Sequence, residues 1–213
     1  MKLKWCKHSY FIVETGGLKI AIDPHDGGSI GLESCRVEAD LVLVTHNHYD
    51  HNAIEIASGA KTIVVKWRPG IFKIGGVNVR GFKYYHDNVG GRLRGETIAY
   101  KLEAEKLKIL HLGDLGHTLT DRDVEELGEI DILMIPVGGV YTINYREAWT
   151  IIRQVNPKIF IPMHYWTPKA LTPLDPIDKL LNIAETPKIK IEKDPLEVDA
   201  NNIPEKTTLL IMP

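Results

Sequence analysis

The residues best suited to chemistry lie in one short segment, positions 46–51, which reads HNHYDH. His46 and His48 are two positions apart, and in an extended segment such residues point the same way, so both imidazoles can reach one metal ion. Asp50 and His51 follow where we expect a helix to begin, and the turn sends them to the other side of the same pocket. The start of a helix also favours an acidic side chain. The segment therefore offers four ligands to two adjacent metal ions.

This spacing is rarely accidental. A single His or Asp is more often structural than a metal ligand, but HxHxDH arises by chance in only about one of a thousand sequences of this length and composition. Three imidazoles packed together without a metal would also be costly to bury if any of them were protonated. The segment therefore predicts a metal site.

The motif follows Asp40–Thr45 (DLVLVT), a continuous apolar run that predicts a buried strand. Other short segments rich in apolar and β-branched residues predict further strands, at Leu3–Lys7, Tyr10–Thr15, Leu18–Ile22, Thr62–Lys66, Ile71–Ile74, Val77–Tyr85, Thr97–Glu103, Leu107–Leu112, Asp131–Val137, Lys158–Met163 and Lys206–Met212. Helices are expected over Asp50–Ser58 with Gly59 as its stop, over Asp121–Leu127 with Thr120 as its cap, and over Tyr145–Val155. Residues 172–202, rich in Pro and charge, are expected on the outside. Strands gather in each half with helices between and after them, which predicts two packed sheets with helices outside.

Three more residues follow the motif in an order that resembles the metallo-β-lactamase superfamily. Its signature is HxHxDH after a strand, then a later His, then an Asp in a Gly-Asp pair, and a last His after a strand. His86 (KYYH), Asp114 (in Gly113-Asp114) and His164 (FIPMH) fill these places. Each lies at the end of a predicted strand, where open α/β sheets place ligands.

The resemblance implies an α/β fold, a four-layer αββα sandwich of two packed mixed sheets flanked by helices, with residues 1–213 as one domain. It also implies two metal sites, formed by His46, His48 and His86 and by Asp50, His51 and His164, with Asp114 bridging them. His111 and His117 compete with His86 for its place. His111 lies inside a strand, which favours a core role, whereas His117 is expected either to line the pocket or to lie on the surface.

The chain is also similar to a small stand-alone branch of the superfamily, the UlaG-like hydrolases. The similarity lies in HSYF (8–11), IDP (22–24), HLGDLGH (111–117) and IPVGG (135–139). It implies that His8 and Asp23 lie near the metals and that Tyr141 faces the substrate. Asp23 would fix a metal-bound imidazole through a hydrogen bond, as outer carboxylates do. The alternatives are a turn residue before Pro24 for Asp23 and a hydrogen-bonded strand residue for His8.

The implied activity is hydrolysis of a small-molecule substrate at a binuclear centre. Two metals lower the pKa of a bound water, and the resulting metal-bound hydroxide cleaves an ester, lactone or phosphodiester bond. Asp50 would orient the water or accept its proton, and no GxSxG nucleophile elbow is present. Imidazole and carboxylate ligands without Cys suit Zn²⁺, with Mn²⁺, Fe or Ni²⁺ as alternatives. Substrate choice is expected to depend on the loops at Gly27–Glu33, His86–Gly95 and Tyr165–Pro173.

Three other functions compete with this one. A phosphodiesterase or ribonuclease would use the same metals on phosphorus, although we find no space for an RNA-binding element. A diiron oxidoreductase of this fold typically carries Glu where His48 stands, together with a flavin domain. A non-catalytic protein would keep the metal for stability alone.

Composition limits the partners and the location. The net charge of 26 − 28 = −2 gives no electrostatic reason for tight nucleic-acid or membrane binding. No apolar run approaches the ~20 residues that span a bilayer, and Met1–Tyr10 lacks the features of a signal peptide. The expected location is therefore the cytoplasm. Cys6 and Cys35 show no CxxC spacing, so we expect two reduced thiols. A homo-oligomer remains open.

Overall fold

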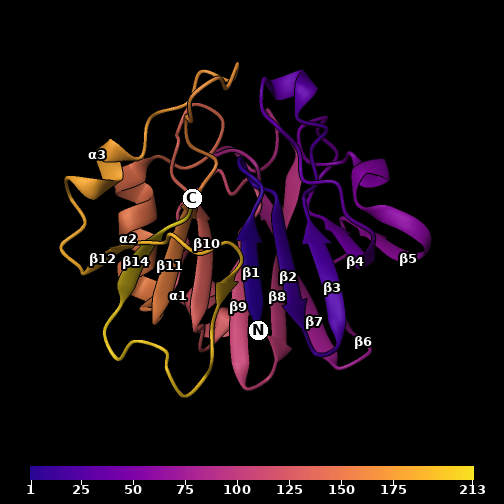
Figure 1. Cartoon of the computed structure of the whole chain (residues 1–213). Coiled ribbons are helices and arrows are strands. Elements are labelled where there is room, and N and C mark those ends of the chain that lie inside the picture. The colour runs from indigo at the N-terminus through magenta and orange to yellow at the C-terminus, as the bar shows by residue number, and fades with distance from the viewer.

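Two mixed β-sheets pack face to face in the computed structural model, which describes all 213 residues (Figure 1). The first sheet has the order β13-β1-β2-β3-β4-β5. Its strands are β1 (Lys2–Trp5), β2 (Phe11–Thr15), β3 (Leu18–Ile22), β4 (Ala39–Val44), β5 (Ser58–Lys66) and β13 (Leu196–Glu197). Strands β3, β4 and β5 are parallel, whereas β1 and β2 are antiparallel to their neighbours.

The second sheet has the order β12-β14-β11-β10-β9-β8-β7-β6. Its strands are β6 (Gly70–Ile74), β7 (Val77–Tyr85), β8 (Glu96–Ala104), β9 (Leu107–His111), β10 (Ile132–Pro136), β11 (Ile159–Met163), β12 (Lys188–Lys190) and β14 (Thr208–Ile211). The half from β9 to β12 is parallel, and β6 to β9 form antiparallel pairs. The C-terminal segment thus adds strands to both sheets.

Alternating residues of the first sheet face two different cores. In β2, β3 and β4 the residues of one set, which includes Phe11, Ile22 and Leu43, pack into the main core between the sheets. The intervening residues, such as Ile12 and Val42, pack into a smaller core on the outer face. Because residues 41–44 of β4 are buried on both faces, this part of the strand is apolar without interruption, as the DLVLVT run predicted.

The outer layers differ between the two sheets. Helices α1 (Asp121–Leu127), α2 (Tyr145–Val155) and α3 (Asp178–Leu181) lie beside the second sheet (Figure 1). Thr120 caps α1, and Asn144 caps α2, each in a reciprocal capping box. The first sheet is covered only by loops and two 3₁₀ turns, η1 (Gly28–Ile30) and η2 (Ile54–Ile56). The helices of this chain are too short or too polar to cross a membrane.

Most predicted elements are confirmed, and the helix over Asp50–Ser58 is wrong. The bounds of β3, β7, α1 and α2 agree residue for residue. In place of the helix the chain forms η2, and Gly59 lies inside β5 instead of ending a helix. The N–H of Ala53 donates to the loop after β3 (2.9 Å), and the carbonyl of Ala57 accepts from the start of β4 (2.9 Å). These bonds to neighbouring segments take the place of the backbone bonds between residues four apart that an α-helix needs.

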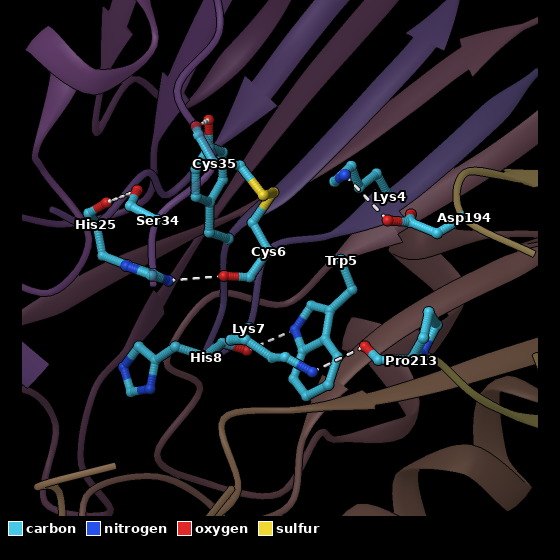
Figure 2. The surroundings of a disulfide bond; sticks show 11 residues. Lys4, Trp5, Cys6, Lys7, His8, His25, Ser34, Cys35, Asp194 and Pro213 are labelled. Atoms are coloured by element: carbon cyan, nitrogen blue, oxygen red, sulfur yellow. Dashed lines mark hydrogen bonds and ion pairs between the residues drawn. A yellow bond between two sulfur atoms is a disulfide. The ribbon is translucent and has the colours of Figure 1, made fainter. Parts of the chain in front are cut away.

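Cys6 and Cys35 form a disulfide, so the prediction of two reduced thiols is wrong (Figure 2). Cys6 directly follows β1, and Cys35 lies in the long loop before β4. The hydroxyl of Tyr10 donates to the carbonyl of Cys35 (2.9 Å), which helps to hold this loop against the end of β1. The two cysteines are 29 positions apart, and only the packing of that loop on the sheet brings them together.

Candidate metal centre

The predicted site residues follow strands that run in one direction within each sheet. In the first sheet β1, β3 and β4 are followed by His8, Asp23 and the HNHYDH segment. In the second sheet β7, β9 and β11 are followed by His86, Asp114 and His164. Strands that run the same way end at the same edge, so their following loops meet there. The sandwich therefore concentrates the ligating side chains at one end of the molecule.

The side chains form two main clusters, and within each the ligating atoms lie within 4.8 Å of one another; a third group, Asp23, His46 and His51, spans the two. One consists of His46, His48 and His86, and the other of His8, Asp50, His51 and His164. In the first cluster Nε2 of His46 lies 3.1 Å from Nδ1 of His48. Two nitrogens bound tetrahedrally to one zinc ion would be about 3.3 Å apart. The spacing within this cluster therefore suits ligands of a single metal.

Asp114 lies between the two clusters. Its Oδ2 atom is 3.1 Å from Nε2 of His164 and 3.3 Å from Nε2 of His51. The same atom is 3.4 Å from Nε2 of His86 and 3.9 Å from Nε2 of His46. One buried carboxylate oxygen thus faces imidazoles of both clusters, which is the arrangement that a bridging ligand requires.

The carboxylate of Asp23 fixes the ring of His51 through a hydrogen bond. Its Oδ2 atom accepts from Nδ1 of His51 (2.9 Å) and from the hydroxyl of Thr45 (2.7 Å), and its Oδ1 atom accepts from the Thr45 N–H (2.8 Å). Because Nδ1 of His51 is bonded to Asp23, the Nε2 atom is the one that faces Asp114 (3.3 Å) and would bind a metal. Asp23 is therefore hydrogen-bonded to the ring of His51, which is the contact that an outer carboxylate would make with a metal-bound imidazole.

His8 joins the second cluster through Asp50. Its Nε2 atom lies 3.0 Å from Oδ2 of Asp50, and its ring centroid lies 4.1 Å from that of His164. The carbonyl of His8 accepts from the N–H of His164 (3.0 Å) and from the indole of Trp5 (3.0 Å; Figure 2). His8, Asp23 and His164 all have left-handed backbone, with φ of 52°, 51° and 50°. Such conformations cost about 1–3 kcal/mol each and cluster at functional sites.

Two glycines allow the ligand loops to pass close to each other. A Cβ atom at Gly116 would collide with the backbone of His86 and Asp87, and one at Gly138 would collide with the carbonyl of His164. Glycine is the only residue without that atom. The HLGDLGH and IPVGG segments therefore contribute by letting His86 and His164 reach the centre.

Most of the candidate ligands have protonation states that suit metal binding. Burial lowers the pKa of His8 to about 3 and that of His86 to about 4, and it lowers the pKa of His46 well below its usual value. Burial opposes the ionisation of Asp114, but His164 and His51 hold its pKa well below the usual range. Neutral imidazoles and ionised carboxylates are the forms that bind metals. His51 is the exception: burial opposes its protonation, but Asp114, Asp50 and Asp23 raise its pKa well above 6.5, so a metal would have to displace its proton.

Several buried polar atoms at the centre have no hydrogen-bond partner. They are His51 Nε2, His86 Nδ1, Asp114 Oδ1 and His164 Nδ1. Burying an unpaired polar group costs free energy. Metal ions that took up His51 Nε2 and Asp114 Oδ1 would remove part of this cost, so the residues present fit a metal centre.

Comparison with known proteins decides the family. Residues 2–164 match the family model described as "Beta-lactamase superfamily domain". The chain belongs to the metallo-β-lactamase superfamily. It is 32% identical to a UPF0173 metal-dependent hydrolase of Thermococcus onnurineus, over 81% of this chain and 89% of that protein. A relative of the same description in Thermococcus kodakarensis is 33% identical, with the same coverage.

A solved structure extends the similarity to the whole chain. It is a Thermotoga maritima protein named as a zinc-dependent hydrolase of the metallo-β-lactamase superfamily, with 34% identity and a TM-score of 0.80. The match covers 100% of this chain and 99% of that protein. The predicted superfamily and sandwich fold are confirmed, and the protein is a metal-dependent hydrolase.

A cavity of about 450 Å³ opens over the metal centre of this hydrolase. Its floor includes Asp50 and Asp114. Its walls come from the three loops predicted to shape substrate choice, through Ser29, Arg94 and residues 171–173. A larger cavity of about 670 Å³ lies under the C-terminal segment, but no cluster of ligating groups faces it.

The other predicted residues have separate places. Tyr141 lines the cavity. His117 does not: its Nε2 atom accepts from the N–H of Tyr85 (3.3 Å), and its ring packs against Tyr84 and Tyr85 outside the centre. His111 is buried in the core, where its Nδ1 atom accepts from the N–H of Gly113 (3.1 Å), as its place inside a strand predicted.

Arg94 and Tyr49 line the cavity and were not singled out from the sequence. Arg94 is one of 26 basic residues, and nothing in its neighbours' sequence distinguishes it. A signal for it does exist at Asp87, which directly follows a ligand candidate and precedes a loop with glycines at positions 90, 91 and 95. Such a carboxylate commonly organises a turn.

Proposed function

We propose that this hydrolase works with two divalent metal ions that share Asp114. His46, His48 and His86 would hold one ion, and Asp50, His51 and His164 the other. The observation that supports this best is the position of Asp114 Oδ2, within 3.9 Å of imidazole nitrogens from both clusters. The ligand set contains no Cys, so zinc is the proposed metal, with manganese, iron or nickel as alternatives.

Divalent metals in such a centre supply an activated water and polarise the oxygen of the bond to be cleaved. The chain's own part is to position the reactants. Asp50 lines the cavity with 14% of its side chain exposed, and it accepts from His8 (3.0 Å). Burial opposes its ionisation, but His51 and His8 keep its pKa far below the usual value, so it stays ionised. We propose that the free oxygen of Asp50 orients the attacking water.

We propose a small substrate with an ester, lactone or phosphodiester bond. The cavity volume of about 450 Å³ falls within the range usual for small-molecule sites, roughly 300–1,000 Å³. We also propose that residues 1–213 act as one domain, because β13 completes the first sheet while β12 and β14 complete the second.

The test combines metal analysis with a substrate panel. The protein is purified without chelator, its metal content is measured by elemental analysis, and turnover is measured on esters, lactones, thioesters and bis(para-nitrophenyl) phosphate. We expect close to two metals per chain and turnover on one class. His48→Ala and Asp50→Ala should abolish turnover and lower the metal content, while the circular dichroism spectrum stays unchanged.

His117→Ala is the matched control, because it removes the same kind of side chain outside both clusters. It should keep wild-type metal content. Turnover on bis(para-nitrophenyl) phosphate alone would indicate a phosphodiesterase instead of an esterase or lactonase. Near-wild-type turnover in His48→Ala would exclude the binuclear centre, and metal without any turnover would favour a structural role.

A further inference from the structure

Arg94 is a half-buried cation in the wall of the cavity, and it lacks a carboxylate partner. No Asp or Glu oxygen lies within 4.0 Å of its guanidinium. The one polar contact of this group is the carbonyl of Val140, 3.5 Å away. Removing part of a guanidinium from water without pairing it costs free energy. Of its five N–H donors, all but the one directed at Val140 are therefore available to a ligand in the cavity.

The aromatic ring of Tyr141 holds this guanidinium in place. The central carbon of the Arg94 guanidinium lies 5.5 Å from the centre of the Tyr141 ring, a distance at which a cation and an aromatic face attract each other. Both side chains line the cavity. This contact favours the position of the guanidinium in the wall of the cavity.

A buried carboxylate fixes the loop that carries Arg94. Asp87, only 3% exposed, accepts four backbone N–H groups: Val89 (2.9 Å) and Gly91 (2.8 Å) bond to Oδ1, and Leu93 (2.8 Å) and Arg94 (2.8 Å) bond to Oδ2. The loop is thereby ordered from its first residue to Arg94. A binding group that is already positioned loses less conformational entropy when its ligand binds.

Exposed apolar side chains also line the mouth of the cavity. Tyr49 is 60% exposed, Leu171 is 72% exposed, and both line the cavity beside Tyr141. Large apolar side chains exposed around a single opening mark a ligand-binding surface more often than chance. The mouth therefore combines apolar contact with one unpaired positive charge.

We propose that Arg94 determines the specificity of this hydrolase by binding a carboxylate or phosphate group on the substrate, apart from the bond that is cleaved. Arginine pairs with either anion through two parallel hydrogen bonds. The substrate class is thus an anionic ester or lactone with an apolar body. The inference rests on the proposed function for the reaction, but the anion site has its own test.

The first experiment compares two esters that differ in one group. In para-nitrophenyl adipate a carboxylate stands where para-nitrophenyl hexanoate has a methyl group. Arg94→Gln should lower kcat/KM for the adipate ester about tenfold to a hundredfold, mainly through KM, and leave the hexanoate ester within about twofold. Arg94→Lys should recover part of the loss, because it keeps the charge but not the planar fork.

Arg92→Gln is the matched control. Arg92 lies in the same loop, bonds to the carbonyl of Val89 (2.9 Å) and does not line the cavity. It should behave as the wild type with both esters. An equal loss for both esters in Arg94→Gln, or the same loss in Arg92→Gln, would overturn the proposal.

The second experiment measures binding without turnover. Adipate and inorganic phosphate are titrated separately into the full chain after incubation with zinc, and the Arg94 Nε–Hε resonance is followed by NMR. A saturable shift with either anion supports the site and shows which group it takes. No shift up to about 10 mM of both anions would overturn it. A shift without turnover on any ester would leave the site standing and reject the reaction.

Asp87 provides a third arm, because it is a positioning residue that acts through Arg94. Asp87→Asn keeps the size of the side chain but weakens its bonds to the loop. It should lower the preference for the adipate ester over the hexanoate ester. In the double variant with Arg94→Gln the preference should fall no further than in Arg94→Gln alone. Additive losses would show that Asp87 acts independently of Arg94.

Discussion

Asp23 lies outside the signature motif but contacts two residues at the candidate metal centre. Its side chain is fully buried, and its two oxygens accept from His51, from the Thr45 hydroxyl and from the Thr45 N–H. Thr45 directly precedes the first histidine of the motif. One carboxylate therefore fixes both the start of the HNHYDH segment and the ring of its last residue. The left-handed backbone at Asp23 (φ 51°) is the local cost of this position.

We predict that Asp23→Asn weakens metal binding about tenfold to a hundredfold, as loss of an outer carboxylate does in other metal sites. The amide cannot accept the His51 proton and both Thr45 donors, so the free energy of unfolding should also fall by about 1–3 kcal/mol. Competition with a chromogenic chelator measures the metal affinity. Asp40→Asn is the control, because Asp40 is exposed and bonds only to the N–H of Lys19. Equal affinities in wild type and Asp23→Asn would contradict the positioning role.

At the scale of elements, the disulfide joins two parts of the centre's surroundings. Cys6 stands two positions before His8, and Cys35 closes the loop that contains His25 and Ser29. Nε2 of His25 lies 2.9 Å from the carbonyl of Cys6, next to the disulfide (Figure 2). The loop before β4 has no helix or strand of its own beyond η1. The disulfide, the hydrogen bond from Tyr10 to Cys35 and the small outer core help to hold it on the first sheet.

We predict that the double variant Cys6→Ser, Cys35→Ser lowers the free energy of unfolding by about 3–4 kcal/mol, since the disulfide closes a loop of 29 residues in the unfolded chain. Urea denaturation measures this change. Wild type under reducing conditions should match the variant. Thiol titration of the denatured wild-type protein, without reductant, should find no free thiol. Two free thiols and an unchanged stability would mean that the cysteines stay reduced.

The elements that the sequence predicted well are those determined by local pattern. β4 is recognisable because both of its faces are buried, and α1 is recognisable because Thr120 caps it. The segment after the motif was misjudged because its backbone bonds go to β4 and to the loop after β3, and no local pattern reveals such partners. The disulfide and the position of Arg94 could not be predicted from the sequence for the same reason. Both depend on which loops meet at the edge of the sandwich.

At the scale of the whole molecule, the fold gathers titratable groups at one end. Seven of the nine histidines in the chain are buried, and an eighth, His48, is half-buried. Burial lowers the pKa of His8 to about 3 and of His86 to about 4. Burial opposes protonation of His51 as well, but the carboxylates of Asp114, Asp50 and Asp23 raise its pKa well above 6.5. The metal-free protein thus carries groups that respond to pH in opposite directions.

We predict that the stability of the metal-free protein is greatest near pH 6.5. Between pH 6.5 and 4 the histidines of the unfolded chain become protonated, whereas His8 and His86 stay neutral in the folded protein because their pKa values are lowered. The free energy of unfolding therefore falls as pH falls, by roughly 3 kcal/mol for His86 alone. Above pH 6.5 the unfolded chain loses the proton that His51 retains in the folded state, so stability falls as pH rises. Metal binding displaces the His51 proton and removes this second loss.

Thermal unfolding of chelator-treated and metal-loaded protein from pH 4.5 to 9 measures both effects. A metal-free Tm that stays constant below pH 6.5 would show that the buried histidines are not neutral, and an alkaline loss that persists with metal would show that His51 is not a ligand.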